Sequence, residues 1–254
     1  MQIKILGWAG GIGANLRTTS FLVDDDLLID AGTGLGDLPL NHMTGIRHIF
    51  LTHSHMDHIV GLPLLADSMF GVHDEPIIVH AEERTIEALK AHVFNWVIWP
   101  DFSELPNRDN PSIRFEVMNP GDVVSIRSRD IEMIEVNHTV PGVGYCLSSR
   151  RASVAFSGDT TTNDNLWEVL NRYENIDLLF VESAFSNHDV EISKISKHYC
   201  PSLLGADILK MKHRPDVWLT HFKPGDEELI YQECVDAMPD FNVHQIKGGE
   251  IFKF

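Results

Sequence analysis

The stretch His48-Ile49-Phe50-Leu51-Thr52-His53-Ser54-His55-Met56-Asp57-His58 carries the strongest signal for the fold. It begins with an apolar run that ends at Thr52 and is typical of a buried strand. Three histidines and one aspartate then follow within six positions, before Gly61. Imidazole nitrogen and carboxylate oxygen are ligands that suit zinc or a comparable divalent ion. One isolated histidine would more often lie in a surface loop, but four ligand-type residues after one strand favour a metal site.

Further residues of the same type follow three other predicted strands. A shared site needs side chains that converge at one edge of the fold, and strand ends meet this need. Any one of these residues alone could be a turn or capping residue, because Asp and Asn are common there. The recurrence of a strand followed by a ligand-type residue indicates one common site. The strands and the residues that follow them are Ile131–Val136 with His138, Ala152–Ser157 with Asp159, and Val217–Thr220 with His221.

The remaining pattern predicts an α/β (α+β) protein with two mixed sheets covered by helices, in a single domain over residues 1–254. A hairpin is expected where Phe21–Val23 and Leu27–Asp30 flank an acidic turn. Asp101–Pro111 is the one long loop-like insertion, and no repeat or low-complexity linker is visible. Other expected strands are Ile77–His80 and Leu178–Val181, and expected helices are Glu82–Val93, Asn165–Tyr173, Pro201–Lys210 and Glu227–Ala237.

Composition limits the classes of partner. The formal net charge is −17, which disfavours extended contact with DNA or RNA, although bound metal ions can reverse the sign within one pocket. The first residues show neither a signal peptide nor a membrane-spanning stretch, so no membrane association is expected. Three dispersed cysteines (Cys146, Cys200 and Cys234) form no disulfide framework and indicate the cytoplasm. Each is expected to be a small buried residue.

The pattern His53-x-His55-x-Asp57-His58, followed by His138, Asp159 and His221, resembles the metallo-β-lactamase superfamily over nearly the whole chain. The resemblance implies a four-layer αβ/βα sandwich with two divalent metal ions at one edge of the sheets. Zinc is expected, with manganese or iron as alternatives. It also implies the ligand sets, with Asp159 bridging the two ions. One ion would be held by His53, His55 and His138, and the other by Asp57, His58 and His221.

Two metal ions suit hydrolysis of a phosphodiester, whose leaving alkoxide needs a proton. Glu182 at a strand end and His198 before a helix are candidates for this role, although each alone could be a surface residue. They resemble the paired glutamate and histidine of the phosphodiesterase branch of the superfamily. That resemblance implies that Asp57 aligns the attacking water, Glu182 orients His198, and His198 protonates the leaving oxygen.

Within this branch, several stretches are similar to class II 3′,5′-cyclic-nucleotide phosphodiesterases. They include Leu16–Leu22, Ile29–Gly34 and Thr220–Pro224. We therefore expect a small phosphodiester substrate, cyclic AMP or cyclic GMP. A ribonuclease Z-like or generalist phosphodiesterase would share the same site residues. A thioester or lactam hydrolase is the second alternative, but it leaves Glu182 and His198 unexplained.

The stretch from Asn95 to Phe102 also resembles the class II enzymes and is rich in aromatic residues. Trp96, Trp99 and Phe102 could stack on a purine base. More often such side chains bury a helix face or form a dimer contact, so a homodimer stays open.

Overall fold

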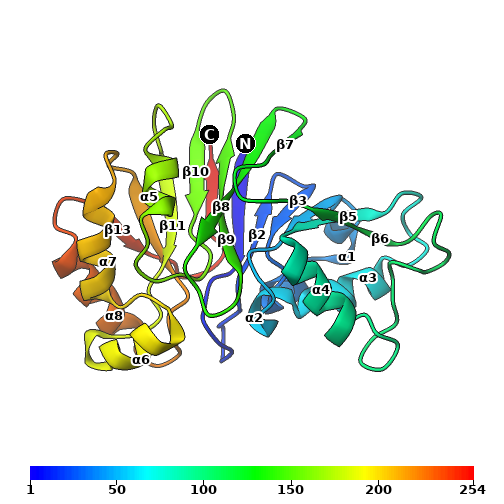
Figure 1. The fold of residues 1–254 in the computed structure, drawn as a ribbon, viewed down its shortest axis with the longest axis horizontal. Coiled ribbons are helices and arrows are strands. Elements are labelled where there is room, and N and C mark those ends of the chain that lie inside the picture. Colours follow the sequence, from blue (N-terminus) through cyan, green and yellow to red (C-terminus); the bar gives the residue numbers. More distant parts are fainter.

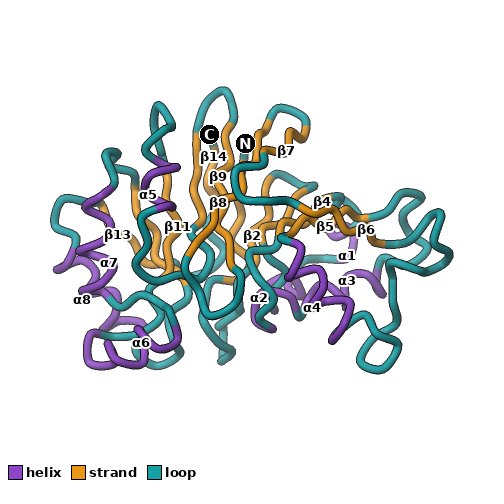
Figure 2. The backbone as a smooth tube through the Cα atoms, viewed as in Figure 1, coloured by secondary structure: helices purple, strands orange, loops and turns teal.

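Two seven-stranded β-sheets lie face to face in the computed structural model, which describes residues 1–254. Helices cover the outer face of each sheet (Figures 1 and 2). The strand orders are β14-β1-β2-β3-β4-β5-β6 and β13-β12-β11-β10-β9-β8-β7.

Each sheet mixes antiparallel and parallel pairs, as the sequence predicts. The strands of the first sheet are β1 (Gln2–Gly7), β2 (Ser20–Val23), β3 (Leu27–Ile29), β4 (His48–Phe50), β5 (Ile77–Ala81), β6 (Ile113–Val117) and β14 (Ile251–Lys253). Those of the second sheet are β7 (Val123–Ile126), β8 (Arg129–Val136), β9 (Gly142–Ser148), β10 (Ser153–Phe156), β11 (Leu178–Glu182), β12 (Asp216–Thr220) and β13 (Asn242–Gln245).

The helices divide between the two outer layers. The α-helices are α1 (Leu40–Met43), α2 (Met56–Ile59), α3 (Gly61–Ser68), α4 (Glu83–His92), α5 (Asn165–Leu170), α6 (Val190–Ser196), α7 (Pro201–Asp207) and α8 (Glu227–Ala237). Three short 3-10 helices are η1 (Thr33–Asp37), η2 (Asn187–Asp189) and η3 (Ile208–Lys210). None of the helices is long and apolar enough to cross a membrane.

Three apolar clusters hold the layers together. The middle cluster lies between the sheets and includes Phe21, Phe156 and Phe180, whose ring centroids are 5.0–5.2 Å apart. A second cluster packs α3 and α4 on the first sheet, and a third packs α5, α7 and α8 on the second sheet. Burial on both faces of each sheet produces the predicted four layers.

Most predicted elements form within one or two residues of their expected bounds. The hairpin pairs β2 with β3, and α8 matches its predicted range. Glu82 is the N-cap of α4, and its side chain accepts a hydrogen bond from the Arg84 amide. The strand expected to reach Thr52 ends at Phe50, because the Thr52 amide leaves the ladder and donates to Asp30 Oδ1 at 2.8 Å.

Two predicted helices are shorter than expected, and six strands were not predicted. The helix expected to reach Tyr173 ends at Leu170, and the one expected to reach Lys210 changes to 3-10 geometry at Ile208. Four of the unpredicted strands are the edge strands of the two sheets, where the chain is more exposed and the apolar pattern is broken: β6, β7, β13 and β14. The other two are β1, which runs into glycines, and β9, which contains Gly142 and Gly144.

Candidate metal centre

The ligand-type residues gather in one cluster. They lie in α2 or in the segments next to β4, β8, β10 and β12, and Figure 1 shows the positions of these elements. His53 and His55 lie in the turn after β4, and Asp57 and His58 lie within α2 itself. His138, Asp159 and His221 follow β8, β10 and β12. Because β10, β11 and β12 run parallel in register, their carboxyl ends meet at one edge of the second sheet. The structure therefore brings together all seven residues that the sequence indicated.

These seven residues form two groups that share one member. Within each group, one ligand-type atom per residue lies within 4.8 Å of the others. The shared member is Asp159, whose Oδ2 lies 3.6 Å from His53 Nε2, 3.2 Å from His58 Nε2 and 3.1 Å from His221 Nε2. The first group is His53, His55, His138 and Asp159, and the second is Asp57, His58, Asp159 and His221.

Buried polar atoms in the cluster fit a bound cation. His53 Nε2, His58 Nε2 and Asp159 Oδ2 are buried, and apart from their close contacts within the cluster they have no hydrogen-bond partner. Leaving such groups unpaired costs free energy, and coordination of a metal ion would satisfy all three. Burial also lowers the pKa of His138 to about 4 and of His221 to about 3, although the charge of Asp159 opposes both shifts. Neutral imidazoles at pH 7 are the form that binds metal. The cluster is therefore compatible with a dinuclear metal site.

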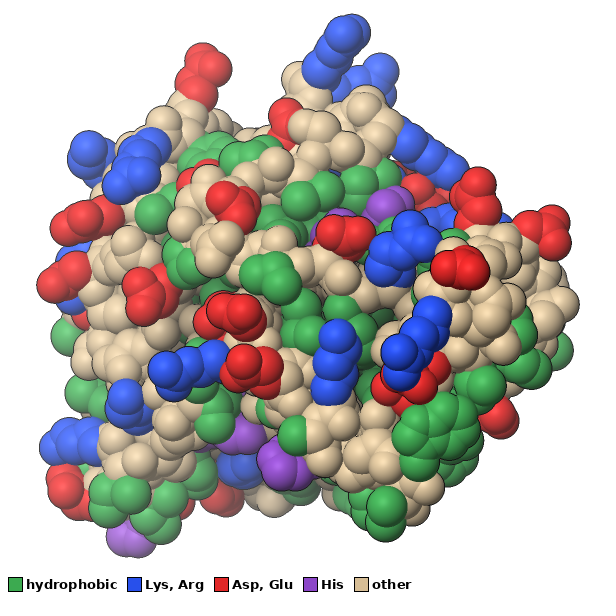
Figure 3. Space-filling model, turned by 45° about the vertical axis from the view of Figure 1, so that its right-hand side comes forward, with side chains coloured by type: hydrophobic (Ala, Val, Ile, Leu, Met, Phe, Trp, Pro, Cys, Tyr) green, Lys and Arg blue, Asp and Glu red, His purple; other side chains and the backbone are tan.

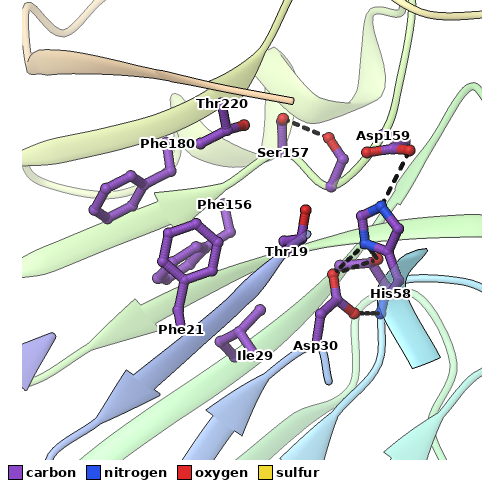
Figure 4. A pocket seen from close by; sticks show the side chains of 12 residues that line it. Thr19, Phe21, Ile29, Asp30, His58, Phe156, Ser157, Asp159, Phe180 and Thr220 are labelled. Atoms are coloured by element: carbon purple, nitrogen blue, oxygen red, sulfur yellow. Dashed lines mark hydrogen bonds and ion pairs between the residues drawn. The ribbon is translucent and has the colours of Figure 1, made fainter. Parts of the chain in front are cut away.

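A second layer of groups orients these imidazoles. His58 lies between Asp30 and Asp159 (Figure 4), and its Nδ1 is 2.7 Å from Asp30 Oδ2. The carboxylate of Asp30 also accepts hydrogen bonds from the amide and the hydroxyl of Thr52, both at 2.8 Å. Such carboxylate–histidine pairs fix the ring nitrogen that faces the metal. Asp30 was not recognised as a site residue, because in sequence it ends a hairpin strand.

Glu182 and His198 form a pair beside the cluster. His198 Nδ1 lies 2.7 Å from Glu182 Oε1, and both side chains are buried. Glu182 also accepts hydrogen bonds from the amides of Thr160, Ala184 and Tyr199, at 2.8, 3.1 and 3.2 Å. Burial disfavours the charged imidazole, but the charge and hydrogen bond of Glu182 outweigh it, so the pKa of His198 is raised.

The His198 ring also contacts residues of both metal-ligand groups. It stacks on the His221 ring, with centroids 4.9 Å apart and planes 27° apart. It meets the His138 ring edge-on at the same centroid distance. This position would allow His198 to reach a substrate held at the cluster.

The aromatic side chains of the segment from Asn95 to Phe102 lie partly in the core and partly on the surface. Phe102 is buried in the cluster under α3 and α4, and Trp99 packs against it. Trp96 is 59% exposed and has a positive φ of 65°. No helix spans these residues, so burial of a helix face does not describe them. Only Trp96 has an indole free for another molecule.

Comparison with known proteins identifies the family. The β-lactamase superfamily domain model matches residues 26–222. The chain belongs to the metallo-β-lactamase superfamily. The metallo-β-lactamase fold protein YhfI of Bacillus subtilis superposes with a TM-score of 0.78, at 18% identity and with 99% of each chain covered. This likeness confirms the predicted four-layer fold.

Two curated relatives represent two kinds of superfamily enzyme. Ribonuclease Z of Haloarcula marismortui is 32% identical over 155 residues, which cover 58% of this chain and 47% of that protein. A probable 3′,5′-cyclic-nucleotide phosphodiesterase of Yersinia pestis is 24% identical over 279 aligned positions, which cover 89% of this chain and 79% of that protein. The chain thus spans about half the length of the ribonuclease Z it matches.

Proposed function

We propose that this protein is a dinuclear metal-dependent phosphodiesterase that hydrolyses a 3′,5′-cyclic nucleotide. The observation that carries the proposal is the buried Glu182–His198 pair, 2.7 Å between side-chain atoms, in contact with the metal-ligand histidines. Hydrolysis of a cyclic phosphodiester expels an alkoxide, which needs a proton donor at this place. The similarity to the Yersinia pestis phosphodiesterase extends over 89% of the chain and supports the same substrate class.

In this proposal the seven residues hold two divalent ions, of which zinc suits the donor set best. Manganese and iron are the alternatives. When bound, the two ions activate water and stabilise negative charge on the phosphoryl oxygens. His53, His55 and His138 would hold one ion and Asp57, His58 and His221 the other, and Asp159 would be shared by the two groups.

Side chains of the protein then supply the proton for the leaving oxygen and orient the attacking water. Glu182 binds Nδ1 of His198, so that Nε2 is the nitrogen free to protonate the leaving sugar oxygen. Its charge also favours the protonated imidazole. The Asp57 side chain is 29% exposed, more than those of His58 and His221, and can align the attacking water as well as ligate. The three free cysteines support a reducing compartment such as the cytoplasm.

A ribonuclease Z-like or generalist phosphodiesterase activity is the second candidate, favoured by the 32% identity to ribonuclease Z. Two observations argue against extended RNA contacts. The net charge is −17, and the face in Figure 3 carries acidic and basic side chains interspersed, with no continuous basic surface. A thioester or lactam hydrolase would give the Glu182–His198 pair no role.

A direct test measures turnover of cyclic AMP, cyclic GMP, bis(p-nitrophenyl) phosphate, precursor tRNA and a thioester by the metal-loaded protein. We expect a cyclic nucleotide to give the highest kcat/KM, and the variant Asp159→Asn to lose this activity. Accurate cleavage of precursor tRNA with no cyclic-nucleotide turnover would replace the proposal by the second candidate. Hydrolysis of the thioester alone would reject both.

A further inference from the structure

Lys197 stands between the end of α6 and the candidate proton donor His198. Its backbone is left-handed, with φ 53° and ψ 49°, a conformation that costs energy for a residue with a Cβ atom. After this residue the chain folds back on α6. The His198 amide donates to the Ser193 carbonyl at 3.0 Å, and Ser193 Oγ donates to the His198 carbonyl at 2.7 Å.

Two further contacts join Lys197 to His138, 59 residues earlier in the chain. The Lys197 carbonyl lies 3.1 Å from His138 Nδ1 and can accept its proton. The Lys197 ammonium donates to the His138 carbonyl, also at 3.1 Å. One residue therefore holds both the ring and the backbone of His138.

The ring contact also decides which nitrogen of His138 can bind a metal. A proton on Nδ1, donated to the Lys197 carbonyl, leaves Nε2 with its lone pair free. Nε2 is the nitrogen that faces the cluster, 3.1 Å from His55 Nδ1. On its other side Lys197 is bonded to His198, whose ring lies 4.9 Å from that of His138.

We propose that Lys197 is a positioning residue that couples the two halves of the site. Its carbonyl holds His138 in the metal-binding tautomer, and its place in the chain fixes the spacing between His138 and His198. Its ammonium holds the His138 backbone and so limits the movement of His138. The expected effect of Lys197 on turnover rests on the proposed function. Its effect on metal binding is independent of the substrate.

The test compares Lys197→Met with Lys194→Met. Lys194 lies on α6 one turn earlier, and its ammonium is on the surface, 2.9 Å from Glu191 Oε1. Zinc affinity is measured by competition with a chelator, and turnover is measured with bis(p-nitrophenyl) phosphate. Lys197→Met keeps the backbone carbonyl that contacts His138 Nδ1 but loses the ammonium that holds the His138 backbone. We expect it to bind two ions, one of them about 10-fold more weakly, because His138 is then less firmly positioned. Lys194→Met should match the wild type, and Lys197→Arg should restore part of the affinity.

The variant Lys197→Gly distinguishes the role of Lys197 in positioning His138 from its role as the left-handed residue that ends α6. Glycine adopts a left-handed backbone without strain, so this variant should unfold at the same or a higher urea concentration than Lys197→Met. It lacks the ammonium, so it should show the same loss of zinc affinity. Wild-type zinc affinity in both variants would overturn the proposal. Absence of cyclic-nucleotide turnover in the wild type would reject the proposed function and leave the zinc measurements valid.

Discussion

The imidazole of His198 has neighbours on two sides, a carboxylate on one and the rings of the candidate ligands on the other. Glu182 binds its Nδ1, and the rings of His138 and His221 lie 4.9 Å away on the side of the cluster. A residue that only shaped the metal site would affect all substrates alike. A proton donor affects those substrates whose leaving group is a poor one.

His198→Ala should therefore lower turnover of a cyclic nucleotide about 10²–10⁴-fold, the usual contribution of general acid catalysis. Loss of activity on bis(p-nitrophenyl) phosphate should be much smaller, because p-nitrophenolate leaves without a proton. Metal content should stay at two ions by elemental analysis. Glu182→Gln should repeat the pattern more mildly, whereas Asp57→Ala should impair both substrates. Equal losses on the two substrates in His198→Ala would rule out the proton-donor role.

At the scale of elements, parallel strand pairs place the site and also bring the half-buried His48 against the buried His80. His48 begins β4 and His80 lies in β5, with His48 Nδ1 3.1 Å from His80 Nε2. The His80 ring stacks on Phe50 at 4.3 Å and is almost fully buried. Burial, with the neighbouring His48, lowers the pKa of His80 to about 4.

This pair should make the fold sensitive to acid. The pKa of His80 in the unfolded chain is near 6.5, so the unfolded state binds the proton first as the pH falls. The contribution of neutral His80 to the free energy of unfolding is therefore fully present above pH 6.5. It is lost between about pH 6.5 and 4, and the loss amounts to at most about 3 kcal/mol. Urea unfolding at several pH values should show a shallower pH dependence for His80→Leu than for the wild type. The exposed His92→Leu should retain the wild-type slope, and an unchanged slope in His80→Leu would refute the assignment.

At the scale of the whole molecule, the candidate metal centre joins segments from both sheets. The residues of the first group come from the β4 turn and from the ends of β8 and β10, and those of the second come from α2 and from the ends of β10 and β12. Two bound ions would therefore tie the two halves of the sandwich together.

Removal of the metal should lower the thermal stability. A ligand at 100 times its Kd stabilises a protein by about 2.7 kcal/mol, and for this size each kcal/mol raises the Tm by about 2–4 °C. Elemental analysis should find about two ions per chain, and a chelator should lower the Tm by at least about 5 °C. His221→Ala should show a smaller chelator effect. A Tm that does not respond to the chelator would count against a dinuclear centre in the folded protein.

The sequence by itself predicted the parts that depend on local pattern. Apolar runs and periodicity indicated most of the buried strands and the main helices, and the residue types after four strands indicated all seven members of the cluster. The edge strands β6, β7, β13 and β14 carry no such pattern, because half of each faces solvent.

Only the tertiary structure decided which distant residues meet. Asp30 ends a hairpin strand in sequence, and it becomes the partner of His58 because β3 and β4 lie side by side. Lys197 contacts His138 across 59 residues, and no periodicity links the two. Local pattern records whether a residue is buried and how the chain bends, because those depend on near neighbours. Orientation of a ligand depends on hydrogen bonds between separate elements, and these exist only once both sheets are packed.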